Sequence, residues 1–253
     1  MSDQASTIMV NTLEPQSGTT LTVGKSGQNL QVNADSLKAN VAKDAGGNAL
    51  FTSDGSGNLS GLNSGLGSAQ TLIQTQTVTN QATVSFTSGI DSTYVEYVFA
   101  FYNINPATDA AVFGFQGNGA GESGYNESIT SSAFRANHAE ADNWTSLSYQ
   151  GGTMDQANQT AFQEIAITQS NDADSGLAGE LHLFNPASTT YVKHFYSRTS
   201  FMWYTTNQPQ YGDAFATDMY VGGYFNTTTA IDDIQFKMSS GNFDGTIKLW
   251  GVK

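Results

Sequence analysis

The distribution of aromatic residues divides this chain into two parts that differ in what they can fold into. Phe51 is the only Phe, Tyr or Trp before Phe86, whereas aromatic residues are frequent from Phe86 to Trp250. Aromatic side chains each bury a large apolar area and dominate the energetics of protein cores. The segment before Phe86 therefore cannot build an ordinary globular core alone. We expect a slender, polar front followed by a β-domain.

Short strands separated by turns are predicted in the front. Apolar residues recur in the stretches 8–13, 21–23 and 30–32, and residues 34–41 favour a short helix. Each of these strands carries only one or two apolar side chains, so a single copy buries too little surface to offset its conformational entropy. Three copies wound about one axis could share these side chains as a core. A disordered linker is the alternative.

A Gly- and Ser-rich stretch, residues 43–70, follows this segment. Glycine at this density is flexible unless neighbouring chains hold it in place. The stretch also contains leucines that mark candidate inward-facing positions, Leu50, Leu59, Leu62 and Leu66. We expect a neck here, between an N-terminal attachment segment of short strands (residues 1–42) and a head (residues 71–253).

Alternation of apolar and polar residues is the dominant pattern of the head. About ten β-rich segments separated by Gly, Pro, Asn and Asp clusters predict an antiparallel β-sandwich of the jelly-roll type. The predicted strands are 78–86, 94–102, 111–116, 144–148, 162–168, 177–184, 191–196, 201–204, 218–225, 231–238 and 245–252. The last two are expected to form a closing hairpin whose apolar face completes the sandwich.

The composition excludes several classes of protein. The net charge of −13 argues against a nucleic-acid partner, because neutralising phosphates requires clustered Lys and Arg. The absence of cysteine excludes disulfides and Cys-based zinc sites, and no apolar run is long enough to span a membrane. Only 12% of the residues are charged, and the sequence Met1-Ser2-Asp3-Gln4 does not begin a signal peptide. A polar, weakly charged composition without a secretion signal is typical of virion proteins.

No motif predicts catalysis, a metal or a cofactor. The three histidines, His138, His182 and His194, lack the spacing of a helical zinc site and are interpreted as packed or surface residues of strands. Residues 121–124 resemble a hydrolase nucleophile motif, but Tyr125 occupies the position of its second glycine. Residues 171–176 lack the closing Glu of a calcium loop and are interpreted as a solvated turn. The chain is therefore not expected to be an enzyme.

Sugar binding is the one ligand chemistry that the composition of the loops favours. Aromatic rings stack on glycans, and amide side chains donate and accept hydrogen bonds to them. The candidate ligand-binding residues are Trp144, Trp203, Tyr204, Asn207, Gln210 and Tyr211. A place for Trp203 in the hydrophobic core is the alternative.

Two ends of the chain resemble a known group of proteins. Residues 14–27, Glu-Pro-Gln-Ser-Gly-Thr-Thr-Leu-Thr-Val-Gly-Lys-Ser-Gly, resemble a run near the N-termini of virion structural proteins of marine tailed bacteriophages, of the fibre or appendage type. Residues 234–243 and 245–251 resemble the closing hairpin of these proteins, and residues 184–195 fit the same group. The group has no catalytic motif that could be transferred to this chain.

The resemblance implies a homotrimeric fibre or appendage on the exterior of a virion. Its N-terminal segment would attach to other virion proteins, and its head would face a glycan or receptor on the host surface. A capsid decoration, cement or head-fibre protein with a stabilising role is the alternative. A polysaccharide-degrading tailspike is a third interpretation, but it usually requires a long parallel β-helix, and no repeating strand period of that kind is present.

Overall fold

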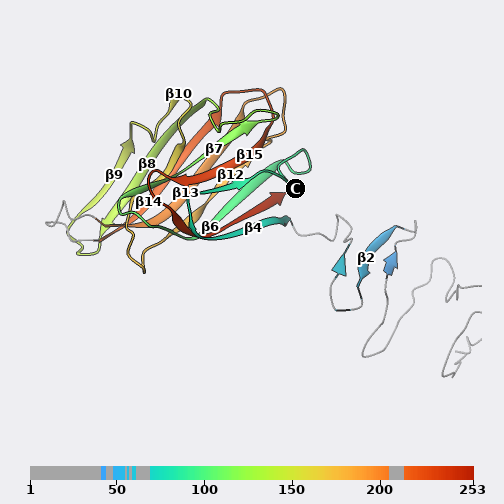
Figure 1. Cartoon of the computed structure of the whole chain (residues 1–253), viewed down its shortest axis with the longest axis horizontal. Helices are drawn as coiled ribbons and strands as arrows, with labels where there is room; N and C mark the ends of the chain where they lie inside the picture. Colours follow the sequence, from blue (N-terminus) through green and yellow to red (C-terminus); the bar gives the residue numbers. More distant parts are fainter. Residues whose placement is uncertain (1–40, 44–47, 55, 57–58, 61–68, 205–213) are drawn as a thin grey trace, which may run out of the picture. The chain divides into compact units, whose positions relative to one another are not determined.

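The computed structural model describes residues 41–43, 48–54, 56, 59–60, 69–204 and 214–253 (Figure 1). The chain divides into two compact units, Met1–Gly67 and Ser68–Lys253. Every regular element among the described residues is a β-strand, which confirms the predicted all-β class. The strands predicted at 8–13, 21–23 and 30–32 lie outside the described residues.

The first unit contains a small antiparallel sheet in the order β1-β2-β3. Its strands are β1 (Val41–Lys43), β2 (Ala49–Ser53) and β3 (Leu59–Ser60). Val41, which the sequence pattern assigned to a short helix, therefore begins a strand and pairs with Thr52. Leu50 is half-buried and Leu59 is exposed, whereas Leu62 and Leu66 lie outside the described residues. Short strands thus occur inside the predicted neck.

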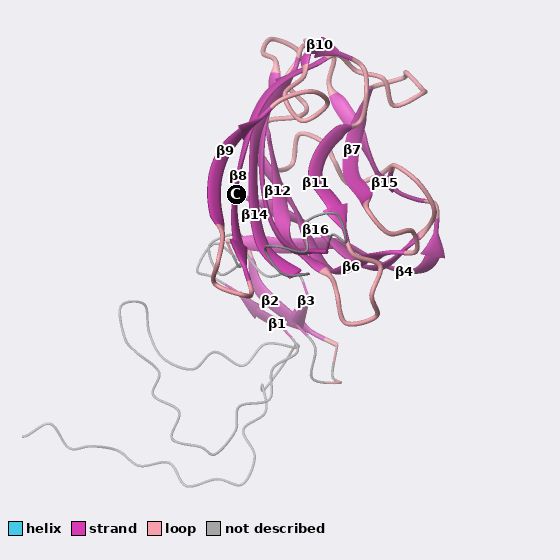
Figure 2. Cartoon of the chain, turned by 90° about the vertical axis from the view of Figure 1, so that its left-hand side faces the viewer, coloured by secondary structure: helices cyan, strands magenta, loops and turns pink. Residues whose placement is uncertain are grey.

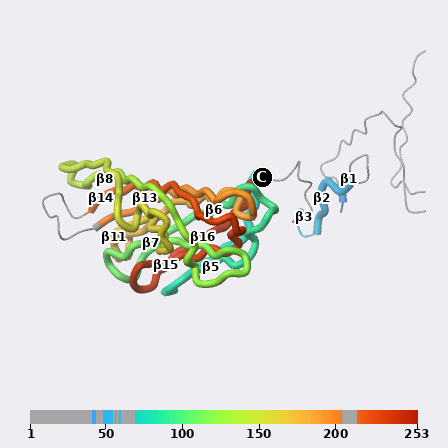
Figure 3. Tube along the Cα trace, turned by 90° about the horizontal axis from the view of Figure 1, so that it is seen from above, coloured from blue at the N-terminus to red at the C-terminus, as the bar shows by residue number. Residues whose placement is uncertain are grey.

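The second unit is a sandwich of two antiparallel layers (Figures 2 and 3). The larger layer has the strand order β4-β16-β6-β12-β13-β14-β8-β9, with β10 also paired to β8, and the smaller layer has the order β11-β7-β15-β5. One residue pair, Gln169 with Trp203, joins β11 to β13 and makes the sheet nearly closed. The predicted sandwich-like head is confirmed.

The bounds of these strands are β4 (Gln70–Gln81), β5 (Thr83–Phe86), β6 (Glu96–Pro106), β7 (Ala111–Gly119), β8 (Ile129–Ala139), β9 (Thr145–Gln150), β10 (Ala157–Gln159), β11 (Gln163–Gln169), β12 (Leu177–Phe184), β13 (Lys193–Tyr204), β14 (Ala214–Phe225), β15 (Ile231–Met238) and β16 (Phe243–Val252).

Three details of the predicted strands are wrong. The strand predicted at 78–86 is two strands, β4 and β5, because the chain bends at Ala82 after Asn80 takes a φ of 53°. The strands predicted at 191–196 and 201–204 are one strand, β13. The closing hairpin is not formed, because β15 pairs with β5 and β7 whereas β16 pairs with β4 and β6.

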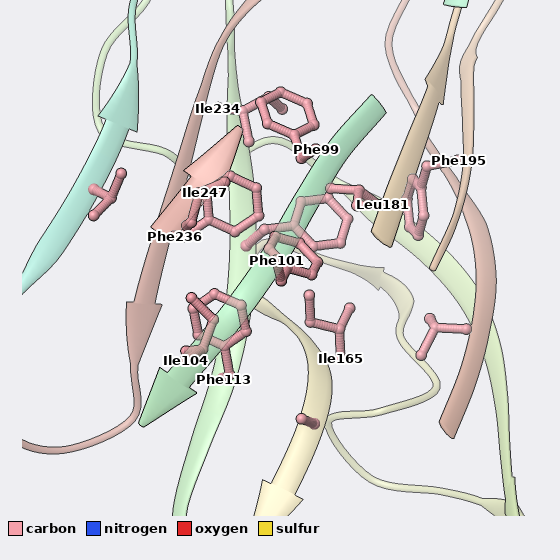
Figure 4. Packing of buried hydrophobic residues seen from close by; sticks show 14 of the residues in the cluster. Phe99, Phe101, Ile104, Phe113, Ile165, Leu181, Phe195, Ile234, Phe236 and Ile247 are labelled. Carbon is pink, nitrogen blue, oxygen red and sulfur yellow. The ribbon is translucent and has the colours of Figure 1, made fainter. Parts of the chain in front are cut away.

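The two layers enclose one aromatic core (Figure 4). Phe236 on β15 lies at its centre and is fully buried. Its ring contacts rings from β5, β6 and β7 at centroid distances of 5.3 to 6.4 Å, namely those of Phe86, Phe99, Phe101, Phe113 and Phe115. Ile247 and Leu249 on β16 are also fully buried in this core. Strands that share no hydrogen bonds are therefore joined by their side chains.

Deletion of residues 1–67 is expected to leave a soluble head that unfolds in one cooperative transition. All residues of the core cluster lie between Val84 and Leu249, inside the second unit. The measurement is a thermal melt of residues 68–253 followed by circular dichroism, beside the full chain. A truncated protein without a cooperative melt would contradict this expectation and make the first unit part of the folding core.

Two buried side chains of opposite charge, Lys193 at the start of β13 and Glu127, attract one another. The Lys193 side chain is fully buried, and its Nζ donates hydrogen bonds to the carbonyl oxygens of Tyr191 (2.9 Å) and Thr227 (3.1 Å). Burial lowers the pKa of Lys193, and the attraction of Glu127 opposes this shift. Burial also raises the pKa of Glu127, and the nearby Glu122 raises it further, although the Gly119 amide donates to Glu127 Oε1 (2.8 Å).

The substitution Glu127→Gln tests this raised pKa. A carboxyl group whose pKa is higher in the folded state stabilises the fold most below its unfolded pKa, here 4.5, and this contribution is lost as the pH rises through the folded pKa. The amide of Gln does not titrate. The free energy of unfolding of the wild type minus that of Glu127→Gln should therefore fall as the pH rises from about 4 to about 7, in urea titrations at each pH. A difference that stays constant or increases would contradict the assignment.

Candidate functional site: the outer face of the larger layer

A row of rings crosses the outer face of the larger layer. Along each strand alternate side chains point outward, which places His182 on β12, Tyr196 on β13, Tyr220 on β14 and Phe134 on β8 on the same face. Successive ring centroids are 4.3, 6.0 and 5.2 Å apart, and successive ring planes are within 14°, 8° and 19° of parallel. We call these four residues the aromatic row. Each ring thus packs against the ring of the neighbouring strand, and the ring planes are nearly parallel from one strand to the next.

The exposed end of the row lies at the edge of the sheet. Phe134 pairs with Tyr220 on one side and with Tyr149 of β9 on the other. Phe134 is 48% exposed and Tyr149 is 64% exposed. Apolar surface is therefore available at this end of the row.

Carboxylates surround the other end of the row. His182 Nδ1 lies 2.5 Å from Glu96 Oε1, and His182 Nε2 lies 3.2 Å from Glu180 Oε1. Burial raises the pKa of the Tyr196 hydroxyl, and the charges of Glu180 and Glu96 raise it further. Tyr196 is therefore a neutral phenol near neutral pH, able to donate and to accept hydrogen bonds.

A hollow of about 520 Å³ opens beside the aromatic row. Small residues of β6, β12 and β13 line it, namely Ala100, Ala178, Gly179 and Ser200, together with the larger side chains of Tyr102, Glu180, Arg198 and Asp218. Arg198 is held by Asp218, because its Nε lies 3.1 Å from Oδ1 and its terminal nitrogen Nη2 lies 2.8 Å from Oδ2. The hollow therefore has polar groups that are already fixed in place.

A second hollow, of about 970 Å³, continues the first and shares Ala178 and Ser200 with it. Its polar lining is made of asparagines and acids, Asn103, Asn105, Glu140, Asn171, Asp174 and Asp244. Asn105 Nδ2 donates to the carbonyl oxygens of Asp172 (2.9 Å) and Ser175 (2.7 Å), which holds the loop that closes this end. We call the two hollows together the outer groove.

The tryptophans predicted to bind a ligand meet elsewhere. The ring centroid of Trp144 lies 5.4 Å from that of Phe215. The ring centroid of Trp203, on β13, lies 5.0 Å from that of Phe215 on its partner strand β14. Trp203 is partly buried, packs against the core, and has the guanidinium of Arg135 5.1 Å from its ring. The structure thus brings both tryptophans around Phe215, which also lines the larger hollow.

The other predicted ligand-binding residues follow Trp203 directly in sequence. Tyr204 is the last residue of β13 and pairs with Ala214. Asn207, Gln210 and Tyr211 lie outside the described residues.

The histidines occupy strands. His182 is half-buried in β12, while His138 and His194 are exposed, and His138 Nε2 lies 3.1 Å from Asp142 Oδ1. Within the described part of the chain, no group of three or more His, Asp or Glu residues could hold a metal ion. The described residues also contain no helix of the length and apolarity needed to cross a membrane.

Comparison with known proteins found no matching family model, no curated protein and no solved structure.

Proposed function

We propose that the protein is a non-enzymatic fibre or appendage of a phage virion, which presents its β-sandwich head to the host surface. The observation that carries this proposal is the outer face of the head, where the aromatic row lies beside an open groove that is lined by the Arg198–Asp218 pair. A face of this kind suits recognition of an external molecule. The resemblance of both ends of the chain to phage fibre proteins supports the same function.

A homotrimer is part of the proposal. The sheet of β1, β2 and β3 is small, and both Val41 and Leu59 in it are exposed. Two or three short strands without a shared apolar face are marginally stable in water. Packing of three copies would bury these side chains, and several weak heads on one particle would gain avidity on a cell surface.

The antiparallel architecture supports a binding role over polysaccharide cleavage. All strand pairs among the described residues are antiparallel, whereas the tailspike interpretation calls for a long parallel β-helix. The outer groove instead lies on one sheet of a sandwich. Incubation of the purified protein with host polysaccharide should leave the chain length of the polysaccharide unchanged.

Immunogold labelling of intact particles with antibodies against the head tests the proposal, together with sedimentation of the purified chain. We expect label on the exterior of the particle and the mass of a trimer. Label at the tail indicates a tail fibre, and label over the capsid indicates the decoration or head-fibre alternative. Particles without label, or a monomer with an ordered N-terminal third, would overturn the proposal or its trimer, respectively.

A further inference from the structure

We infer that the outer groove binds a neutral oligosaccharide. In this arrangement, Tyr102 in the groove and Phe134, which lies on the same outer face beyond the lining of the groove, stack on sugar faces, and the Arg198–Asp218 pair binds hydroxyl groups between them. The inference rests on the proposed host-binding function and deepens it, because it assigns the ligand class and the residues that contact the ligand.

The register of the strands places Arg198 and Phe134 on one line across the sheet, and Tyr102 and Asp218 lie two residues along their strands from this line. Ala100 on β6 pairs with Glu180, Glu180 pairs with Arg198, and Arg198 pairs with Tyr220. The line continues through Phe134 to Tyr149 on the edge strand β9. Neighbouring strands lie about 4.8 Å apart, so the line from β6 to β9 is about 24 Å long. That length suits a chain of several sugar units and exceeds what a single small metabolite fills.

The outer face combines apolar and polar groups, as a sugar does. A pyranose ring has an apolar face of C–H groups and a rim of hydroxyls, so its binding site needs a ring to stack on and polar groups beside it. Tyr102, which is 44% exposed, lines the groove on the β6 side, where Lys248 Nζ lies 5.2 Å from the centre of its ring, and Phe134 is exposed on β8 outside the lining. Between them, Ala178 and Ser200 leave room above the sheet. The outer face therefore presents both a ring to stack on and polar groups close to it.

The polar centre of the groove is fixed before a ligand arrives. The guanidinium of Arg198 is oriented by Asp218 through several short contacts. Remaining donors on the guanidinium and acceptor sites on the carboxylate can bind neighbouring hydroxyls of a sugar. Because the two side chains already hold one another, less conformational entropy is lost on binding.

The charge of the groove selects a neutral ligand. Five carboxylates line it, Glu140, Glu180, Asp174, Asp218 and Asp244, whereas Arg198 is its only lining cation among the described residues. A sugar acid would meet this excess of negative charge, and so would a second copy of the same face placed against it. A neutral oligosaccharide meets no such repulsion, so it is favoured as the occupant over a sugar acid and over a second copy of the chain.

The test begins with the full chain on an array of neutral hexose and N-acetylhexosamine oligosaccharides and their uronic-acid and sialylated counterparts. We expect binding to neutral glycans only. Calorimetry with the best neutral glycan then compares the wild type with Phe134→Ala, Tyr102→Ala and Arg198→Ala, each of which should weaken binding by about tenfold or more. Tyr191→Ala is the matched control, because Tyr191 is 69% exposed but lies neither in the lining of the groove nor on the line of paired residues from Ala100 to Tyr149, and it should bind like the wild type.

Several results would overturn the inference. The wild type could fail to bind any neutral glycan, or it could prefer acidic glycans. The variants at Phe134, Tyr102 and Arg198 could also bind with the same affinity as the control. Self-association of the wild type that Phe134→Asp abolishes would instead make this face an interface between copies.

Adsorption of the proteins to host cells separates the glycan inference from the proposed host-binding function. If the groove variants adsorb as well as the wild type, the inference fails while the host-binding function stands, whereas particles without label would remove the virion function alone.

Discussion

Replacing Phe236 with alanine is expected to lower the free energy of unfolding of the head by about 3–5 kcal/mol, the usual cost of removing a buried Phe side chain. Phe236 is fully buried and contacts rings from both layers. The ring of Phe113 is nearly parallel to it, at 17°, while the ring of Phe86 is perpendicular to it. The remaining rings cannot close the space without leaving their own rotamers, so a cavity should persist.

Urea unfolding of Phe236→Ala measures this loss, and the melting temperature should fall by about 10 °C. Tyr191→Ala is the control, because it also removes one aromatic ring but from an exposed site, and it should change the free energy of unfolding by less than about 1 kcal/mol. Similar losses for the two variants would show that the core is not centred on Phe236.

The strands that the sequence pattern located well are those with large apolar residues at every second position. β12 and β15 have the predicted bounds. Leu181 in β12, and Ile234 and Phe236 in β15, face the core between polar neighbours. Period-two alternation is a property of a single strand, so it can be read without knowing the partner strands.

β8 was missed for the opposite reason. Its inward positions include Asn137 and Arg135, where an apolar residue would be expected. Asn137 is buried because Thr217 Oγ1 donates to its Oδ1 (2.9 Å) and its Nδ2 donates to Ser146 Oγ (3.0 Å). Both partners come from other strands. A polar residue that is satisfied by tertiary contacts looks the same in sequence as one that faces water.

The same limit explains the division of β13 in the prediction. Ser197 and Thr199 interrupt its apolar pattern, yet both are buried. The Ser197 hydroxyl donates to the Glu180 carbonyl oxygen at 2.8 Å, and the Thr199 hydroxyl donates to that of Ile165. These bonds replace the apolar contacts that the pattern requires.

The candidate site depends on sheet order, which the sequence does not reveal. Tyr196 and Tyr220 lie in strands that the sequence pattern predicts, whereas Phe134 lies in the missed strand β8. They form a row because β13, β14 and β8 are neighbours in register. Only the order of the strands brings the three rings together. Loop composition led instead to Trp144 and Trp203, which pack around Phe215.

The adjacent glycines 222 and 223 provide the sharpest test of this register. Gly223 faces inward, and a Cβ there would lie 2.6 Å from the Thr130 carbonyl oxygen and 2.8 Å from Phe195 Cζ. Gly222 faces outward, and a Cβ there would meet only Tyr220 Cε1, at 4.0 Å. The two residues share one strand and one backbone conformation, so they differ mainly in the space available to a side chain.

Gly223→Ala should therefore destabilise the head by about 1–3 kcal/mol or more, because strand β14 must move away from β8 or Phe195 must leave its place in the core. Gly222→Ala should be neutral or slightly stabilising, because alanine lowers the entropy of the unfolded chain and meets no obstacle. Parallel urea titrations of the two variants measure the difference. A larger loss for Gly222→Ala would mean that the register of β14 is shifted by one residue, and it would turn the aromatic row toward the core.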